Sequence, residues 1–226
     1  MDGRRWRLCL MIVLVILIGT LVLQWVNPST MQNHPVGRML QTKLCLSDSA
    51  SVMAYFPTWV NATYQFAGEG LEFAAFTRQV TFATPGFLQI EDLSGTNLVK
   101  IVEVTPEEIR VVWSAEEFYE DRNLLEPSPG RRERLVLLKT PLEVGTSWSD
   151  DRFRREIVEV NKVVQVPLGT FCDVIVVKSE VLDASEGVQY EYYAKNMGLI
   201  KRESQYGREA ESFTVISTLE KLTVGG

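Results

Sequence analysis

The stretch VQYEYYAK at residues 188–195 indicates the fold class of this chain. Apolar and polar residues alternate along it, so that successive side chains fall on opposite faces of an extended backbone. One face holds Val188, Tyr190, Tyr192 and Ala194, and the other holds Gln189, Glu191 and Lys195. A period of two residues is typical of an antiparallel strand with one buried face.

Similar short segments fill the chain from about Ser51 onward. They are rich in Val, Ile, Phe, Tyr and Thr, and Gly, Pro, Asn and Asp separate them. Further strands are predicted near 52–56, 63–67, 71–83, 87–92, 97–104, 109–114, 133–139, 157–166, 174–182, 198–204 and 212–222. Only 115–123 is a candidate for a short helical turn. Turns are predicted at 68–70, 167–170 and 183–187. This pattern predicts an all-β domain, an antiparallel meander that curls into an open or half β-barrel.

Two stretches of the chain resemble each other. In PTWVNATY (57–64) and PLEVGTSW (141–148), a proline is followed four residues later by Asn61 or Gly145, and three residues after that by an aromatic residue. Asn and Gly both tolerate positive φ, so each stretch predicts a loop, a turn and an aromatic that opens a strand. This similarity indicates either two similar halves of the domain or the chance recurrence of a common turn.

The segment Leu8–Val26, LCLMIVLVILIGTLVLQWV, carries no charge and follows Arg4, Arg5 and Arg7. As a helix it would be roughly 28 Å long at ~1.5 Å per residue, which matches the hydrocarbon core of a bilayer. The arginines favour a cytoplasmic N-terminus. A cleaved signal peptide is the alternative, but the apolar run is long for one and no pair of small residues follows it.

The expected organisation is therefore a single-pass protein of the cell membrane with its C-terminal domain outside the cytoplasm. Residues 1–7 form a cytoplasmic tail, 8–26 a transmembrane signal-anchor, 27–49 a polar tether and 50–224 the extracytoplasmic β-domain.

The exported part of the chain is acidic. Residues 1–43 hold five of the 23 Lys and Arg residues but only one of the 29 Asp and Glu residues, so 18 basic and 28 acidic residues remain in 44–226, a net charge of −10. Such a domain would be repelled by nucleic acid, which is not expected as a partner. An exported compartment permits a disulfide between Cys45 and Cys172; two unpaired thiols are the alternative.

The residue types limit the chemistry of the domain. The single histidine, His34, lies in the tether, so neither a histidine-based triad nor a histidine metal ligand is available after it. Cys172 has no histidine to activate it. The carboxylate pairs, such as Glu107-Glu108, leave a two-carboxylate hydrolase as a third hypothesis. No catalytic residue, cofactor or metal is predicted.

Aromatic residues crowd the first strands of the domain. Most are expected to pack in the core, but some could line the concave face of a half-barrel and contact an apolar ligand. The candidate apolar ligand face consists of Tyr64, Phe66, Phe73, Tyr190 and Tyr192.

Several sequence motifs of the chain resemble those of a known group of proteins. Four motifs resemble those of a group of bacterial exported β-domains, which are carried by membrane-anchored proteins or lipoproteins. The motifs are YFP (55–57), GEGLEF (68–73), PLGTFCDVI (167–175) and EYYAKNMGLIK (191–201). The resemblance covers roughly residues 50–224 and implies an open barrel similar to lipoprotein-carrier half-barrels. It implies no catalytic residues, and Asn196-Met197 stands where Pro-Gly is more usual.

These observations favour a non-enzymatic binding or interaction module of the cell envelope, attached to the membrane through Leu8–Val26. Its partner would be an envelope protein or an apolar small molecule. The alternative is a carrier or sensor of a lipid-like or apolar ligand held in the half-barrel. The ligand, the partner and the oligomeric state are not given by the sequence.

Overall fold

The computed structural model describes residues 51–126, 130, 134–182, 187–207 and 212–225. These residues belong to the second of two compact units, 1–43 and 44–226, into which the chain divides. No helix in the described ranges is long and apolar enough to cross a membrane. The predicted tail, the Leu8–Val26 anchor and the tether all lie outside those ranges.

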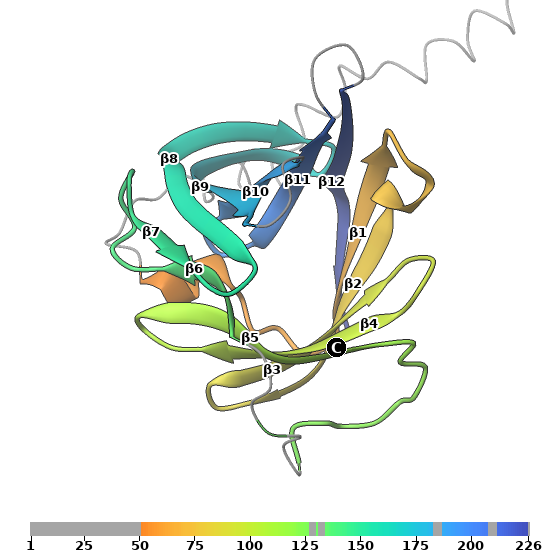
Figure 1. Cartoon of the computed structure of the whole chain (residues 1–226). Coiled ribbons are helices and arrows are strands. Elements are labelled where there is room, and N and C mark those ends of the chain that lie inside the picture. The colour runs from red at the N-terminus through yellow and green to blue at the C-terminus, as the bar shows by residue number, and fades with distance from the viewer. Residues whose placement is uncertain (1–50, 127–129, 131–133, 183–186, 208–211, 226) are drawn as a thin grey trace, which may run out of the picture. The chain divides into compact units, whose positions relative to one another are not determined.

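The domain is built almost entirely from strands (Figure 1). Its strands are β1 (Ala62–Glu69), β2 (Phe76–Thr84), β3 (Phe87–Leu93), β4 (Leu98–Val104), β5 (Glu108–Glu116), β6 (Leu135–Lys139), β7 (Ser147–Ser149), β8 (Phe153–Val166), β9 (Gly169–Val181), β10 (Val188–Ala194), β11 (Gly198–Tyr206) and β12 (Phe213–Val224). The described part also holds two short 3₁₀ helices, η2 (Val52–Tyr55) and η3 (Glu72–Ala74).

All twelve strands form one antiparallel sheet in the order β6-β5-β4-β3-β2-β1-β12-β11-β10-β9-β8-β7. The prediction of an all-β antiparallel fold is therefore confirmed. The sheet is not closed, because no backbone ladder of the described residues joins β6 to β7. The opening differs from that of a simple meander, whose first and last strands form the edges: here β1 and β12 pair along their length, and the edges lie in mid-chain.

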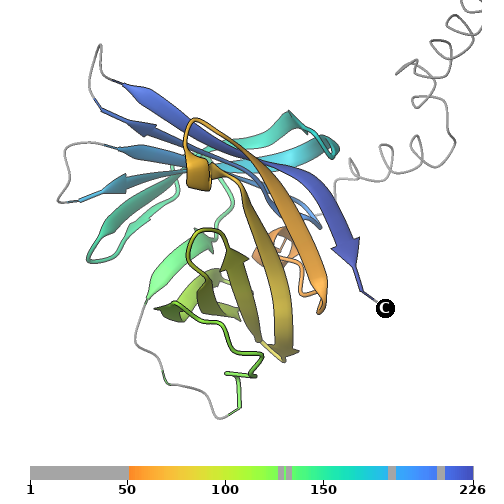
Figure 2. The same ribbon diagram turned by 90° about the vertical axis from the view of Figure 1, so that its right-hand side faces the viewer.

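The two similar loop segments precede β1 and β7, the first strands of the two halves of the sheet, β1–β6 and β7–β12. PTWVNATY leads into β1 and PLEVGTSW leads into β7. Asn61 and Gly145 both adopt positive φ, at 61° and 91°. The residue after each turn donates its amide to an equivalent carbonyl, Ala62 to Trp59 and Thr146 to Glu143. The predicted local geometry is thus confirmed at both turns. Figure 2 shows β1 (orange) beside β12 (blue), the pairing that joins the two halves of the sheet.

A short helix lies between the halves where a strand was predicted. Residues 52–55 form η2, which contacts both β5 and β11. Its Val52 is fully buried, and Asn196 in the β10–β11 turn donates its amide to Ala54. The prediction of a strand over 52–56 was wrong because VMAY packs as a single turn, with Ser51 accepting a hydrogen bond from the Met53 amide at its start.

Two other local predictions are corrected. Residues 71–83 do not form one strand, since η3 occupies 72–74 before β2 begins at Phe76. Residues 115–123 form no helical turn: β5 extends to Glu116, and Glu117 then adopts a positive φ of 56° that a helix does not allow. The segment that follows crosses the outer face of the sheet, where Phe118 and Leu124 are buried. The small core there also contains Val99, Ile101 and Val112.

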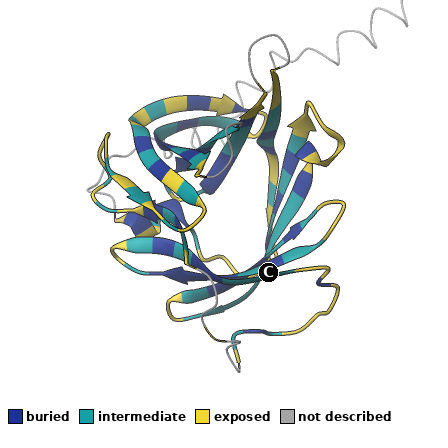
Figure 3. Ribbon diagram, viewed as in Figure 1, coloured by how far each residue is buried: buried dark blue, intermediate teal, exposed yellow. Residues whose placement is uncertain are grey.

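Buried residues alternate with half-buried and exposed ones along many of the strands (Figure 3). The main core fills the concave face around η2, and Ile109, Leu138, Ile157 and Ile200 are fully buried in it. The concave face is not apolar along its whole length, however, and the part that the core does not fill contains the candidate site.

Candidate functional site

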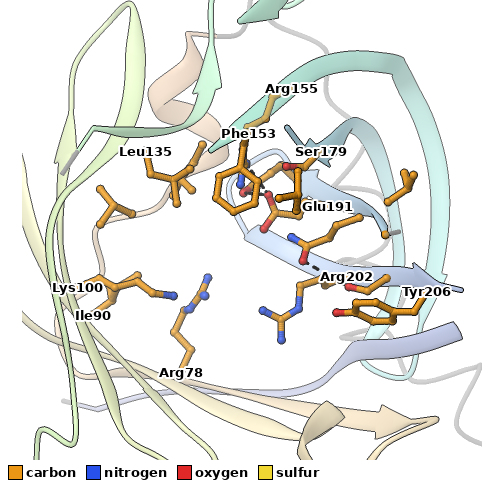
Figure 4. A pocket seen from close by; sticks show the side chains of 18 residues that line it. Arg78, Ile90, Lys100, Leu135, Phe153, Arg155, Ser179, Glu191, Arg202 and Tyr206 are labelled. Carbon is orange, nitrogen blue, oxygen red and sulfur yellow. Dashed lines mark hydrogen bonds and ion pairs between the residues drawn. The ribbon is translucent and has the colours of Figure 1, made fainter. Parts of the chain in front are cut away.

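A cavity of about 330 Å³ lies on the concave face, lined by residues of β2, β3, β4, β5, β6, β8, β9, β10 and β11 (Figure 4). This volume is near the lower end of the range usual for small-molecule pockets, about 300–1,000 Å³. An adjoining hollow of about 260 Å³ shares Lys100 and Arg202 with it. The strands of both halves thus surround one space of a size suited to a small ligand.

The cavity is lined mainly by cations and apolar side chains. Four of the lining residues are basic and one is acidic: Arg78, Lys100, Arg155, Arg202 and Glu191. The apolar lining includes Ile90, Val111, Leu135, Leu137, Phe153 and Val181. An excess of positive charge is unusual inside an acidic domain, since buried charges are normally paired.

Two of the cations share one carboxylate. Arg78 donates from Nε and Nη2 to the two oxygens of Asp92, at 2.6 and 2.8 Å, and Lys100 donates to Oδ2 at 2.7 Å. Burial alone would raise the pKa of Asp92, but the charges of Arg78 and Lys100 and their hydrogen bonds outweigh it and hold that pKa well below its usual range. Asp92 is therefore a carboxylate at any physiological pH.

A second buried network is built on Glu191. Its Oε2 accepts from Arg155 Nη1 at 2.9 Å and from the Tyr193 hydroxyl at 3.1 Å. Burial disfavours the charged form of Glu191, yet the charges of Arg155 and Arg202, together with these hydrogen bonds, lower its pKa. Burial also raises the pKa of Tyr193, which therefore stays a neutral donor to Glu191.

Two polar atoms on the cavity wall have no partner. Arg155 Nε and Ser179 Oγ are buried without a hydrogen bond, and each of the two residues is only 4 % exposed. They are direct neighbours across the β8–β9 ladder. Each unsatisfied buried group costs about 1–3 kcal/mol in free energy. The wall thus holds two adjacent donors that a ligand could satisfy.

Arg202 on β11 also lacks a carboxylate partner. None of the salt bridges formed by the described residues includes it. Its guanidinium instead lies over the Phe76 ring, 4.8 Å from the centroid. Figure 4 shows the side chains of Arg78, Lys100 and Arg202 extending toward the same space.

The structure does not bring the five predicted ligand-face residues together, and none of them lines the 330 Å³ cavity. Tyr64 and Phe66 are buried in the main core beside a separate space of about 20 Å³, room for roughly one water molecule. Phe73 is 61 % exposed and borders the adjoining hollow. Tyr190 and Tyr192 are half-buried on β10. Tyr192 lies within 6 Å of the ammonium groups of two lysines, Lys162 and Lys201.

Sequence reasoning missed the cavity residues because it expected polar faces of strands to be solvated. On β10 the polar positions Gln189 and Glu191 line the cavity. A usable signal was present in β11, where Arg202, Ser204 and Tyr206 recur every second residue and also line the cavity. The alternation was read correctly, but its polar side faces inward.

Cys172 lies on β9 and is disulfide-bonded. Cys45, its predicted partner, lies outside the described residues, so the pairing between these two cysteines stays a prediction. The described residues contain no cluster of three or more His, Cys, Asp or Glu side chains able to hold a metal ion.

No family model and no curated protein sequence matches the chain. Two solved structures are similar to it. One is a candidate exported protein with a YmcC-like fold from Bacteroides fragilis, 14 % identical, with a TM-score of 0.42 over 74 % of this chain and 98 % of that one. The other is a candidate lipoprotein from Parabacteroides distasonis, 13 % identical, with a TM-score of 0.41 over 78 % of this chain and 100 % of that one.

Proposed function

We propose that the chain is a membrane-anchored, extracytoplasmic binding module that holds a small ligand in the cavity of its open barrel and does not transform it chemically. The observation that carries this proposal is the 330 Å³ cavity, lined from nine strands and left unfilled by the core. The uncharged segment Leu8–Val26 behind three arginines supports the membrane attachment.

The buried carboxylates support a binding role over hydrolysis. A two-carboxylate hydrolase needs one carboxyl group that remains protonated near neutral pH, which requires a raised pKa. Asp92 and Glu191 both have lowered pKa values, because cations surround them. Both are therefore acceptors for buried cations and are poorly suited to donate a proton.

A wholly apolar cargo is less well supported than a polar one. Filling the cavity with hydrocarbon would remove water from the half-buried Arg202 without replacing its hydrogen bonds, and would leave the buried atoms of Arg155 and Ser179 without a partner. That desolvation opposes the gain from the apolar contacts. A ligand with its own polar groups avoids this penalty.

The test is the recovery of a ligand with the protein. The full chain is purified from membranes into nanodiscs of zwitterionic lipid, and small molecules released on denaturation are identified by mass spectrometry. Val181→Trp fills the cavity mouth from a residue that is 40 % exposed and lines it. Val163→Trp makes the same change at a 62 % exposed position outside the lining.

We expect a compound of reproducible mass from wild type and Val163→Trp, and much less of it from Val181→Trp. Equal recovery from all three proteins would place the binding site outside the cavity. No recovered compound from any of them would refute tight ligand carriage and direct the search to protein partners.

A further inference from the structure

The charge of the cavity is opposite to that of the domain around it. Residues 44–226 carry a net charge of −10, whereas four cations and one carboxylate line the cavity. Counting Asp92, which binds two of these cations, two positive charges remain in excess. Glu116, at the edge of the adjoining hollow, is exposed to solvent. A walled space with an excess of one sign of charge concentrates ions of the opposite sign.

The hydrogen-bonding groups of the wall indicate where a negative charge would bind. Arg155 Nε and the Ser179 hydroxyl are buried without a partner and adjacent in register, and both residues belong to the cavity lining on β8 and β9. Nη1 of Arg155 is already bound to Glu191, and Nε is the nitrogen of this guanidinium that is buried without a partner. An oxyanion with two oxygens can accept from both groups at once, as carboxylates and phosphates do from arginine.

The next pair on the same face of these two strands is apolar. Phe153 lies two residues before Arg155 on β8, and its partner Val181 lies two residues after Ser179 on β9. Both line the cavity. Leu135 and Leu137 of β6 contribute to the lining from the other half of the sheet. A ligand whose anionic group lies at Arg155 and Ser179 would therefore lay an apolar body along this surface, which an inorganic ion would leave uncovered.

We propose that the cavity binds a small organic anion, with its oxyanion group held by Arg155 Nε and the Ser179 hydroxyl in the field of Arg202, and its apolar body against Phe153 and Val181. The proposal rests on the binding function proposed above and names its ligand class. Carboxylates, phosphate esters and sulfonates share this chemistry, and a volume of about 330 Å³ restricts the ligand to a small molecule.

Two isosteric probes test the charge requirement. The full chain in zwitterionic nanodiscs is titrated calorimetrically with 1-naphthalenesulfonate, an anion, and with 1-naphthalenesulfonamide, its neutral analogue; empty nanodiscs give the background. We expect the sulfonate to bind at least about tenfold more tightly, because one charge-assisted hydrogen bond accounts for a difference of this order. Raising the salt concentration should weaken the binding of the sulfonate alone.

Ser179→Ala gives the sharpest variant. It removes a hydroxyl that has no partner in the protein, so thermal stability should not fall, while sulfonate affinity should fall about tenfold. Arg202→Gln should also weaken the sulfonate and leave the sulfonamide unchanged. Arg154→Gln is the matched control, because Arg154 on β8 is an exposed arginine that does not line the cavity.

Each outcome bears on one proposal. Equal affinity for the two probes, no binding of the sulfonate, or unchanged affinity in both Ser179→Ala and Arg202→Gln would overturn the anion site. If both probes bind equally and Val181→Trp abolishes the binding of both, the anion site is overturned but the cavity remains a binding site. The binding function itself fails only in the ligand-recovery experiment above.

Discussion

Replacement of Asp92 by Asn tests how the charged cavity wall is held together. Asp92 is only 8 % exposed and accepts three hydrogen bonds, two from Arg78 and one from Lys100. Asn has the same shape but no charge, so two partly buried cations, Arg78 and Lys100, would lose their counter-charge. Breaking a buried ion pair by removing one partner costs about 3–5 kcal/mol.

That cost is large against the stability of a domain. Typical domains unfold with about 5–15 kcal/mol, and each kcal/mol corresponds to a shift in Tm of about 2–4 °C for 150–250 residues. Asp92→Asn is therefore expected to lower the Tm of the β-domain by about 6–20 °C. The assay is thermal unfolding of the full chain followed by far-ultraviolet circular dichroism.

Two further variants serve as comparisons for the stability that Asp92→Asn is expected to lose. Lys100→Met leaves the two bonds between Arg78 and Asp92 intact and should cost less than Asp92→Asn. Glu180→Gln breaks the pair with Lys178, whose side chains are 31 % and 41 % exposed, and should cost only about 0–1 kcal/mol. A loss of Tm for Asp92→Asn no larger than for Glu180→Gln would refute the reasoning that Asp92 neutralises partly buried cations.

Two other predictions follow from the same networks and from the sheet opening. The folded state lowers the pKa of Asp92 and of Glu191, so the stability that these two carboxylates contribute is complete above the pKa values of the unfolded chain, about 4, and is lost as the pH falls further. Denaturant unfolding between pH 7 and pH 3 should therefore show a free energy of unfolding that falls with pH, and falls less steeply in Asp92→Asn. A flat profile would contradict this. Trp148 Nε1 on β7 donates to the Val136 carbonyl on β6 at 3.0 Å, across the gap between the edges. Trp148→Phe should cost about 0.5–1.5 kcal/mol and speed amide hydrogen exchange over 135–139 but not over 87–93, whereas unchanged exchange would show that the indole does not join the edges.

The local features of this fold were predictable because they depend on neighbours in the sequence. The two-residue period of 188–194 specified a strand, and Asn61 and Gly145 specified turns with positive φ. Where local prediction failed, tertiary packing had overridden it. Residues 52–55 became a 3₁₀ helix because Val52 and Tyr55 are buried between the two halves of the sheet.

The candidate site was hidden from the sequence for a different reason. Alternation shows that a strand has two unlike faces, but it does not show which face points into the barrel. The aromatic residues Tyr64 and Phe66 matched a binding face by type and packed into the core instead. Arg155 and Ser179 lie 24 positions apart in the sequence and become neighbours only through the pairing of β8 with β9.

The sequence by itself determined the strand-rich character of the domain, its acidity, the positions of several turns and the absence of histidine from it. These follow from residue types and from contacts over a few positions. The tertiary structure decided that β1 pairs with β12, that the opening lies between β6 and β7, and that the polar faces of β10 and β11 line a cavity. A curled sheet buries one face whatever its polarity, and the ion pairs that make a charged interior stable, such as Arg155–Glu191, form only once their strands lie close together in the sheet.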